Sequence, residues 1–129
     1  MTGNTRRKPR RLYIAGPYSA GDPMANIRRA LEAADEALAR GWLPFVPHLS
    51  GFWHFHSPKP WEDWVRMDLA WLEVCDALLR LAGESPGADI EVKYARELGL
   101  PVYAGLADLP VADEPGASEE SDGLGEPGG

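Results

Sequence analysis

The chain lacks both a pair of cysteines and a long apolar run. Cys75 is the single cysteine among 129 residues, so no internal disulfide can form, which agrees with a reducing compartment. No stretch is long enough for a membrane-spanning helix, and no apolar signal-peptide core follows the basic N-terminal residues. We therefore expect a soluble, cytoplasmic protein with no membrane partner.

Several catalytic motifs are also missing. The sequence contains no Walker loop, no G-x-G-x-x-G and no nucleophile elbow with a Ser-His-Asp set. These absences count against kinases, dehydrogenases and α/β-hydrolases. His48, His54 and His56 match no standard zinc spacing, so we expect neither a metal ion nor a cofactor.

The formal net charge of −7 comes mainly from one end of the chain. Residues 111–129 contain acidic residues and no basic residue, and they are rich in Gly, Pro and Ser, which predicts a disordered acidic tail. Residues 1–10 form a basic flexible arm, for which a solvated role is favoured over binding to nucleic acid. The part between them, 11–110, is expected to fold as one small domain.

The central segment alternates strand and helix patterns. Strands are expected over 12–15, 43–47, 76–81 and 101–104, and helices over 23–40, 60–75 and 89–98, with an irregular loop over 48–60. This order predicts an α/β fold, a doubly wound, flavodoxin- or Rossmann-like parallel sheet in three layers. Such sheets bind ligands at the carboxyl ends of their strands, where residues 16–18, 48–56 and 83–91 should meet.

The first helix is expected to bury one apolar stripe. Asp22 is placed to cap it and Pro23 to occupy its first position. The expected stripe consists of Met24, Ile27, Leu31, Ala34 and Leu38.

Asp68 stands in a helical stripe of apolar residues. At helical spacing it shares a face with Trp64 and Leu72, so its carboxylate is expected to point toward apolar neighbours. Burial of a charge is costly unless the charge is paired or hydrogen-bonded. A structural carboxylate that meets Arg66 or Arg80 and a catalytic carboxylate both fit this spacing.

Glu91 is the second candidate carboxylate. It is expected in the first turn of the 89–98 helix, where the helix dipole and free backbone N–H groups favour the ionised form that a carboxylate nucleophile needs. An ordinary first-turn acid that stabilises the helix gives the same pattern.

Two further segments can contact a ligand. The loop 84–88 precedes a helix and offers backbone N–H groups and a hydroxyl to an anion, although such loops also carry Ser and Gly for turn geometry alone. The aromatic segment 52–55 can form a wall against which a flat ring stacks, or a cover over the core.

Three motifs in order resemble the nucleoside 2-deoxyribosyltransferase superfamily. They are Tyr13-Ile14-Ala15-Gly16-Pro17-Tyr18, then Met67-Asp68-Leu69-Ala70-Trp71-Leu72 running to Cys75-Asp76-Ala77, then Ser85-Pro86-Gly87 running to Glu91. The similarity spans about residues 11–105 and is nearest to the branch of 2′-deoxynucleoside 5′-phosphate N-hydrolases and to uncharacterised phage and bacterial relatives.

The resemblance implies roles for individual residues. Glu91 would be the nucleophile that attacks the anomeric carbon and Asp68 its assisting acid, with their carboxyl groups roughly 5 to 9 Å apart as in paired glycosidase acids. The residues expected to bind the substrate are Gly16, Tyr18, His48, Trp53, Ser85 and Gly87. Among these, Ser85 and Gly87 match positions that hold a 5′-phosphate, which favours a nucleotide substrate and hydrolysis to free base and sugar phosphate.

Two other hypotheses remain open, one a different enzyme and one a protein without catalytic activity. The same carboxylates serve a nucleoside 2-deoxyribosyltransferase that moves deoxyribose between bases, and a non-catalytic nucleotide-binding module would keep the pocket without turnover. Lys93 stands where the family often has a small residue, and the aromatic segment 51–64 is longer than in the family, so base specificity stays open. By resemblance, we expect a homodimer or a higher homo-oligomer.

Overall fold

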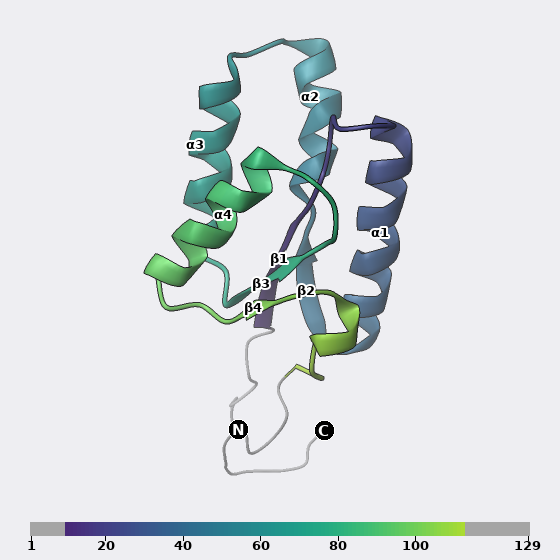
Figure 1. The fold of residues 1–129 in the computed structure, drawn as a ribbon, viewed down its shortest axis with the longest axis vertical. Helices are drawn as coiled ribbons and strands as arrows, with labels where there is room; N and C mark the ends of the chain where they lie inside the picture. Colours follow the sequence, from purple (N-terminus) through teal and green to yellow (C-terminus); the bar gives the residue numbers. More distant parts are fainter. Residues whose placement is uncertain (1–9, 113–129) are drawn as a thin grey trace, which may run out of the picture.

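The computed structural model describes residues 10–112 of the chain (Figure 1). Residues 1–9 of the expected arm and 113–129 of the expected tail therefore lie outside the described residues. The strands are β1 (Arg10–Ala15), β2 (Trp42–Phe45), β3 (Ala77–Arg80) and β4 (Val102–Tyr103). The helices are α1 (Pro23–Ala39), α2 (Ser50–His56), α3 (Trp61–Leu72) and α4 (Pro86–Glu97), with short 3-10 turns at η1 (Pro47–Leu49) and η2 (Leu106–Asp108). None of the helices within residues 10–112 is both long and apolar enough to cross a membrane.

The four strands form one parallel sheet in the order β2-β1-β3-β4. The chain leaves β1 toward β2 and then crosses to β3 on the other side, so a topological switch point lies between β1 and β3. In sheets of this kind the crevice at the carboxyl ends beside the switch point is the usual ligand site. The predicted doubly wound α/β architecture is confirmed.

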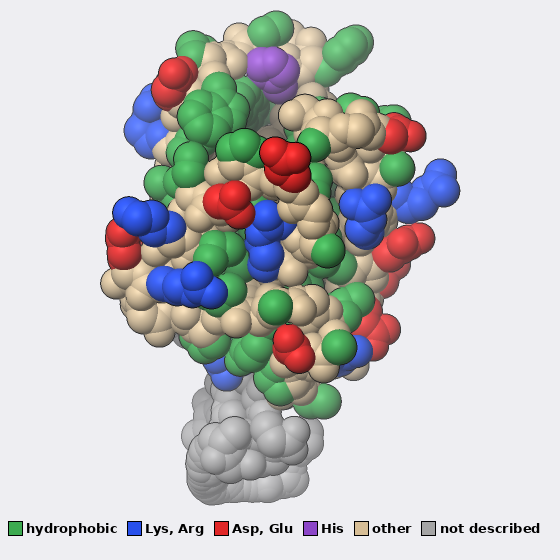
Figure 2. Space-filling model, viewed as in Figure 1, with side chains coloured by type: hydrophobic (Ala, Val, Ile, Leu, Met, Phe, Trp, Pro, Cys, Tyr) green, Lys and Arg blue, Asp and Glu red, His purple; other side chains and the backbone are tan. Residues whose placement is uncertain are grey.

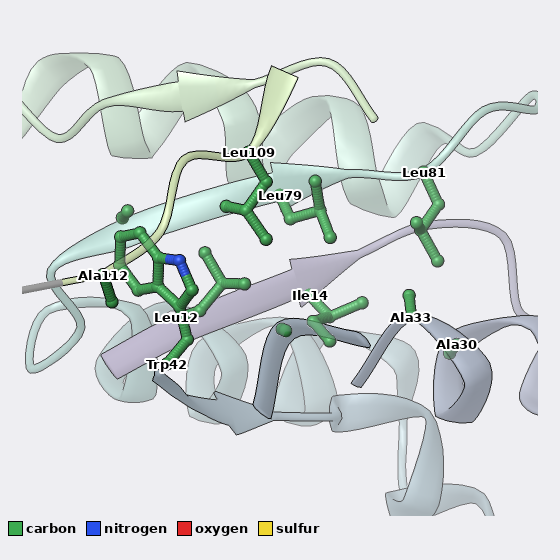
Figure 3. Packing of buried hydrophobic residues seen from close by; sticks show 11 residues of the cluster. Leu12, Ile14, Ala30, Ala33, Trp42, Leu79, Leu81, Leu109 and Ala112 are labelled. Carbon is green, nitrogen blue, oxygen red and sulfur yellow. The ribbon is translucent and has the colours of Figure 1, made fainter. Parts of the chain in front are cut away.

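Helices cover both faces of the sheet, which gives three layers (Figure 1). On one face α1 packs on Leu12, Ile14 and Leu79 through small side chains, and the segment that ends at Ala112 closes the same cluster (Figure 3). On the other face α3 and α4 pack on Tyr13, Ala15 and Leu78. The packed chain thus reaches Ala112, two residues beyond the predicted boundary at 110.

Helix α1 begins as predicted but buries a different face. Asp22 Oδ1 accepts the backbone N–H of Met24 at 3.0 Å, and Pro23 occupies the first helical position. Of the expected stripe, however, Met24 is 65% exposed and Leu38 60% exposed. The buried face carries Asn26, Ile27, Ala30, Ala33 and Ala37. Three alanines on this face let the helix approach the sheet closely. Of the predicted stripe, Ile27 is buried and Ala34 is partly buried, whereas the prediction was wrong for Met24, Leu31 and Leu38.

The aromatic segment expected as an irregular loop is largely helical. Residues 47–49 form η1 and 50–56 form α2, and Ser57 ends the helix with an N–H bond to the carbonyl of Trp53. A helix of two turns depends on tertiary contacts rather than on its own propensity. Here the Trp53 ring meets the Trp64 ring of α3 edge-on at 5.2 Å. The prediction of a loop over 48–60 was therefore wrong.

Candidate functional site

A pocket of about 610 Å³ lies at the carboxyl ends of β1 and β3. It is enclosed by the β1–α1 loop, η1 and α2, one face of α3, and the start of α4. Seven of the eight predicted site residues line it: Gly16, Tyr18, His48, Asp68, Ser85, Gly87 and Glu91. Their positions agree with the expectation that residues 16–18, 48–56 and 83–91 converge.

Asp68 and Glu91 meet inside this pocket. Both side chains line it, and each affects the pKa of the other. Burial raises the pKa of Asp68 to about 6 and that of Glu91 to about 8. Two neighbouring buried carboxylates repel each other, which favours retention of a proton on the pair.

Among residues 10–112, no arginine forms a salt bridge with Asp68. Arg66 pairs with Asp63 at 2.5 Å and Arg80 with Asp89 at 3.1 Å. The alternative that Asp68 is a structural partner of one of these arginines is thus contradicted. Glu91 is the neighbour of Asp68 that the geometry provides.

Tyr13 completes the group and was missed by sequence reasoning. Its side chain is fully buried in β1, and its hydroxyl donates to Glu91 Oε2 at 2.8 Å. This bond favours the ionised form of Glu91 and lowers the pKa of its carboxyl against the effect of burial, while burial and the nearby carboxyl raise the pKa of Tyr13 itself. A tyrosine in the middle of a buried strand was the available signal, because its hydroxyl must find a partner.

The local setting of Glu91 differs from the prediction. Helix α4 begins at Pro86, with Ser85 as its N-cap, rather than at residue 89. Glu91 therefore lies in the second turn, beyond the free N–H groups of the helix start, and it is only 8% exposed. Burial is the dominant influence on its pKa, so the expectation of a carboxylate kept ionised by the helix dipole was wrong.

His48 is buried beside the acid pair's pocket with both ring nitrogens unpartnered. It is 5% exposed, and neither Nδ1 nor Nε2 has a hydrogen-bond partner among the described residues. Burial lowers the pKa of His48, which favours the neutral ring. A buried polar group without a partner is rare in folded proteins. The backbone of Gly16 and Pro17 acts on the ring in the opposite direction to burial, so His48 is held against the end of β1.

The start of α4 presents an anion-binding geometry. Ser85 Oγ accepts the N–H of Ala88 at 3.1 Å, which leaves the hydroxyl proton of Ser85 free to donate. Gly87, in the first helical turn, has open space where a Cβ would lie. Pro86 has no N–H, and those of Ala88 and Asp89 bind Ser85, so the N–H of Gly87 is the one left in this turn to attract negative charge.

Two glycines let the pocket walls approach each other. A Cβ at Gly16 would lie 2.9 Å from the Cβ of Leu81, so β1 and β3 can come together at their ends only because residue 16 has no side chain. A Cβ at Gly51 of α2 would lie 2.2 Å from the hydroxyl oxygen of Tyr18. The close contact between Gly51 and Tyr18 therefore fixes the position of the Tyr18 ring at the pocket.

Trp53 is the predicted site residue that does not line the pocket. Its ring packs against Trp64, and Lys59 Nζ lies 5.2 Å from its centroid. Trp64 and Lys59 both line the pocket, so Trp53 contacts the pocket wall through these two residues. Apolar side chains gather around a histidine over α2 and the start of α3 in the space-filling view (Figure 2).

A metal centre requires a cluster of metal-ligating side chains. Within residues 10–112, no three His, Cys, Asp or Glu side chains cluster in a way that would hold a metal ion.

Comparison with known proteins identifies the family of this chain. A family model described as a domain of unknown function, DUF7768, matches residues 10–104. The chain belongs to the DUF7768 family. All the residues of the acid pair, Tyr13 and the α4 start fall inside the DUF7768 match.

This DUF7768 chain is similar in sequence to a plant protein and similar in fold to two enzymes of known structure. The chain is 30% identical over 101 residues to the desiccation-related protein PCC27-45 of Craterostigma plantagineum, covering 78% of the chain and 56% of the relative. It matches a 2-desoxiribosyltransferase from Leishmania mexicana with a TM-score of 0.53 and 18% identity, over 73% of the chain and 62% of the enzyme. It matches a 2-deoxyribosyltransferase from Bacillus psychrosaccharolyticus with a TM-score of 0.51 and 18% identity, over 71% of the chain and 69% of the enzyme. The DUF7768 chain thus spans just over half the length of the plant relative and shares its fold with the deoxyribosyltransferases.

Proposed function

We propose that this chain is an N-glycosidase that hydrolyses the base–sugar bond of a nucleoside 5′-monophosphate. The observation that carries the proposal is that Asp68 and Glu91, with Tyr13 hydrogen-bonded to Glu91, line one pocket at the switch point of a parallel sheet. Enzymes that cleave glycosidic bonds usually have two paired carboxyl groups. Here both have raised pKa values and face a pocket of substrate size.

The first chemical step uses the proton that the pair shares. In the free protein the higher pKa of Glu91 keeps this proton on Glu91, so the step begins when the proton passes to Asp68. Glu91 is then ionised and can attack the anomeric carbon, while the hydroxyl of Tyr13 donates a hydrogen bond to it. The bond from the sugar to the base breaks as the bond to Glu91 forms, and Asp68 gives its proton to the departing base.

The second step releases the sugar. Water attacks the anomeric carbon, Asp68 accepts a proton from that water, and the bond to Glu91 breaks. The products are the free base and the sugar 5-phosphate, and the pair regains its shared proton. The hydroxyl of Ser85 and the N–H of Gly87 support a 5′-phosphate at the start of α4.

Loss of the Tyr13 hydroxyl should weaken the nucleophile. In Tyr13→Phe the pKa of Glu91 rises further, because the bond that favours its ionised form is gone. Loss of a hydrogen bond to a charged group should lower kcat/KM at neutral pH by about tenfold or more. It should also move the pH profile to higher pH. The profile of base release against pH measures both effects. Tyr103→Phe, in β4 and away from the pocket, should leave the profile unchanged, and equal profiles for all three proteins would contradict the role of Tyr13.

The contact between Gly51 and Tyr18 gives a second prediction. Gly51→Ala places a Cβ where the Tyr18 hydroxyl now lies, so Tyr18 must move and KM should rise by about tenfold. Stability should not fall, because alanine favours a helix more than glycine does. In a Tyr18→Ala background the same substitution should have no further effect on KM. An additive loss in the double variant would show that Gly51 acts by another route.

A chromatographic screen for free base tests the proposed function. Deoxynucleosides, ribonucleosides and their 5′-monophosphates are each incubated with the protein, and base release is measured with and without a second base. Free base together with sugar phosphate supports hydrolysis. A swapped nucleoside instead indicates deoxyribose transfer, the alternative that the shared fold with the two deoxyribosyltransferases favours. Binding without turnover of any compound would replace both with a nucleotide-binding module.

A further inference from the structure

The pocket has two chemically different ends. Acidic side chains, Asp68, Glu84 and Glu91, line it toward α4 and the lower part of α3. The other end is formed by α2, the α2–α3 connection and the start of α3, and it contains His54, Lys59, Trp61 and Trp64. Lys59 is the single cationic side chain among the residues that line the pocket.

His54 is held in one tautomer by its neighbours. Its Nδ1 accepts the indole N–H of Trp64 at 2.8 Å and the backbone N–H of Lys59 at 3.2 Å. A ring nitrogen that accepts two hydrogen bonds carries no proton, so the proton of the neutral ring lies on Nε2. Nε2 has no hydrogen-bond partner among residues 10–112 and therefore offers a free donor.

Lys59 adds donors of the same kind. Its Nζ donates to Ser57 Oγ at 3.2 Å and lies over the Trp53 ring, which leaves further N–H groups of the ammonium free. This end of the pocket thus combines donors from His54 and Lys59 with the aromatic surface of Trp64.

The distance between the two ends suits one nucleoside. Trp64 and Asp68 lie one turn apart on the same face of α3, a rise of about 6 Å. That rise is comparable with the span from the anomeric carbon of a nucleoside to the far edge of its base. If the sugar meets Asp68 and Glu91, the far edge of the base meets His54 and Lys59.

We propose that His54 and Lys59 select bases that carry a keto group at this far edge. A carbonyl oxygen accepts the hydrogen bonds that both side chains offer, whereas an exocyclic amine places donors against donors. The proposal rests on the proposed function, because it takes the acid pair as the sugar end of the pocket. The preferred substrates are then nucleosides or nucleotides of keto bases such as hypoxanthine and uracil.

Matched substrate pairs test this selection. Deoxyinosine is compared with deoxyadenosine and deoxyuridine with deoxycytidine, each as nucleoside and as 5′-monophosphate. We expect the keto member to have a kcat/KM at least about tenfold higher. Lys59→Met should reduce this ratio to within about threefold by lowering kcat/KM for the keto member alone, and Lys59→Arg, which retains donors, should keep most of it. Equal kcat/KM for both members with the unmodified protein would overturn the proposal.

The controls separate other roles of Lys59. Lys93→Met removes an exposed lysine of α4, which pairs with Glu97 outside this pocket, and should leave every ratio unchanged. If Lys59→Met weakens both monophosphates equally and neither nucleoside, then Lys59 binds the phosphate and the proposal is wrong. Thermal unfolding of each variant verifies that the fold is intact.

A binding measurement keeps the test independent of turnover. Hypoxanthine and adenine are titrated against the protein while tryptophan fluorescence is recorded, since Trp53, Trp61 and Trp64 surround the donor end. Tighter binding of hypoxanthine, lost in Lys59→Met, supports the keto selection even if no compound is cleaved and the proposed function fails. Equal binding of the two bases overturns it.

Discussion

Glu91→Gln is expected to lower base release by about a thousandfold or more. The amide cannot attack the anomeric carbon as a carboxylate does, and removal of a covalent nucleophile has effects of this size or larger in enzymes. The side chain keeps its shape, so Tyr13 still has an oxygen to which it can donate. Substrate affinity should change little, because the loss falls on kcat rather than on binding.

Single-turnover kinetics and ligand titration measure these two quantities separately. Glu97→Gln, an exposed position on the same helix, is the matched control and should keep full activity. If Glu91→Gln retained more than about a tenth of the activity, the nucleophile would have to be sought elsewhere. The corresponding change at Asp68, Asp68→Asn, should be less severe for substrates whose base departs without protonation.

The free energy of unfolding is expected to fall as the pH rises from about 4 to about 8. Burial raises the pKa of Glu91 from 4.5 to about 8 and that of Asp68 from 3.8 to about 6. The unfolded chain releases these protons near the ordinary values, whereas the folded chain keeps them, so the folded state binds more protons across this range. The resulting stability is complete below the unfolded values and is lost as the pH passes through the folded ones. For Glu91 alone the loss is on the order of 4 kcal/mol.

Urea unfolding at pH 5 and pH 9 measures this loss. Glu91→Gln carries no titrating group at the position, so most of the pH dependence should disappear and the variant should be the more stable protein at pH 9. Glu97→Gln should follow the unmodified chain at both pH values. A decline of equal size in the unmodified protein and in Glu91→Gln would place the responsible groups outside the acid pair. A protein that is more stable without its proposed nucleophile is a recognised sign of a functional site.

The arrangement of the sheet was predictable because its signals are local and redundant. The short apolar run after Arg11, the cap at Asp22 and the regular alternation of strand and helix patterns each point to the same parallel fold. The site's location followed from topology alone, since the carboxyl ends of neighbouring parallel strands must meet at one edge. For this reason Asp68 and Glu91, far apart in sequence, were both expected at this edge, and both line the pocket there.

The features that were missed depend on contacts across the fold. Helix α2 is built from glycine, histidines and aromatic residues of poor helix propensity, and its packing partner Trp64 is on another helix. No local sequence pattern predicts the contact between α2 and Trp64. The buried face of α1 was missed for a related reason, because apolar periodicity favours leucines while the sheet selects the small alanines at Ala30 and Ala33.

The start of α4 was predictable and was nevertheless misplaced. Ser85 followed by Pro86 is a strong sign of a helix N-terminus, but Gly87 suggested a turn instead. The three-residue error placed Glu91 in the wrong turn and reversed the expected effect on its pKa. Burial of a carboxyl group is a property of the assembled pocket, and the sequence carries it only indirectly.

Cys75, the only cysteine of the chain, is buried between α3 and β3, and burial raises the pKa of its thiol to about 11. A thiol reagent can therefore react with one position only, and only when this junction opens to solvent. The helix that ends there also carries Asp68, so the rate of labelling records the local opening of one wall of the pocket. The native sequence thus contains its own reporter of slow motion, and a bound ligand that steadies α3 would slow the reaction without any engineered probe.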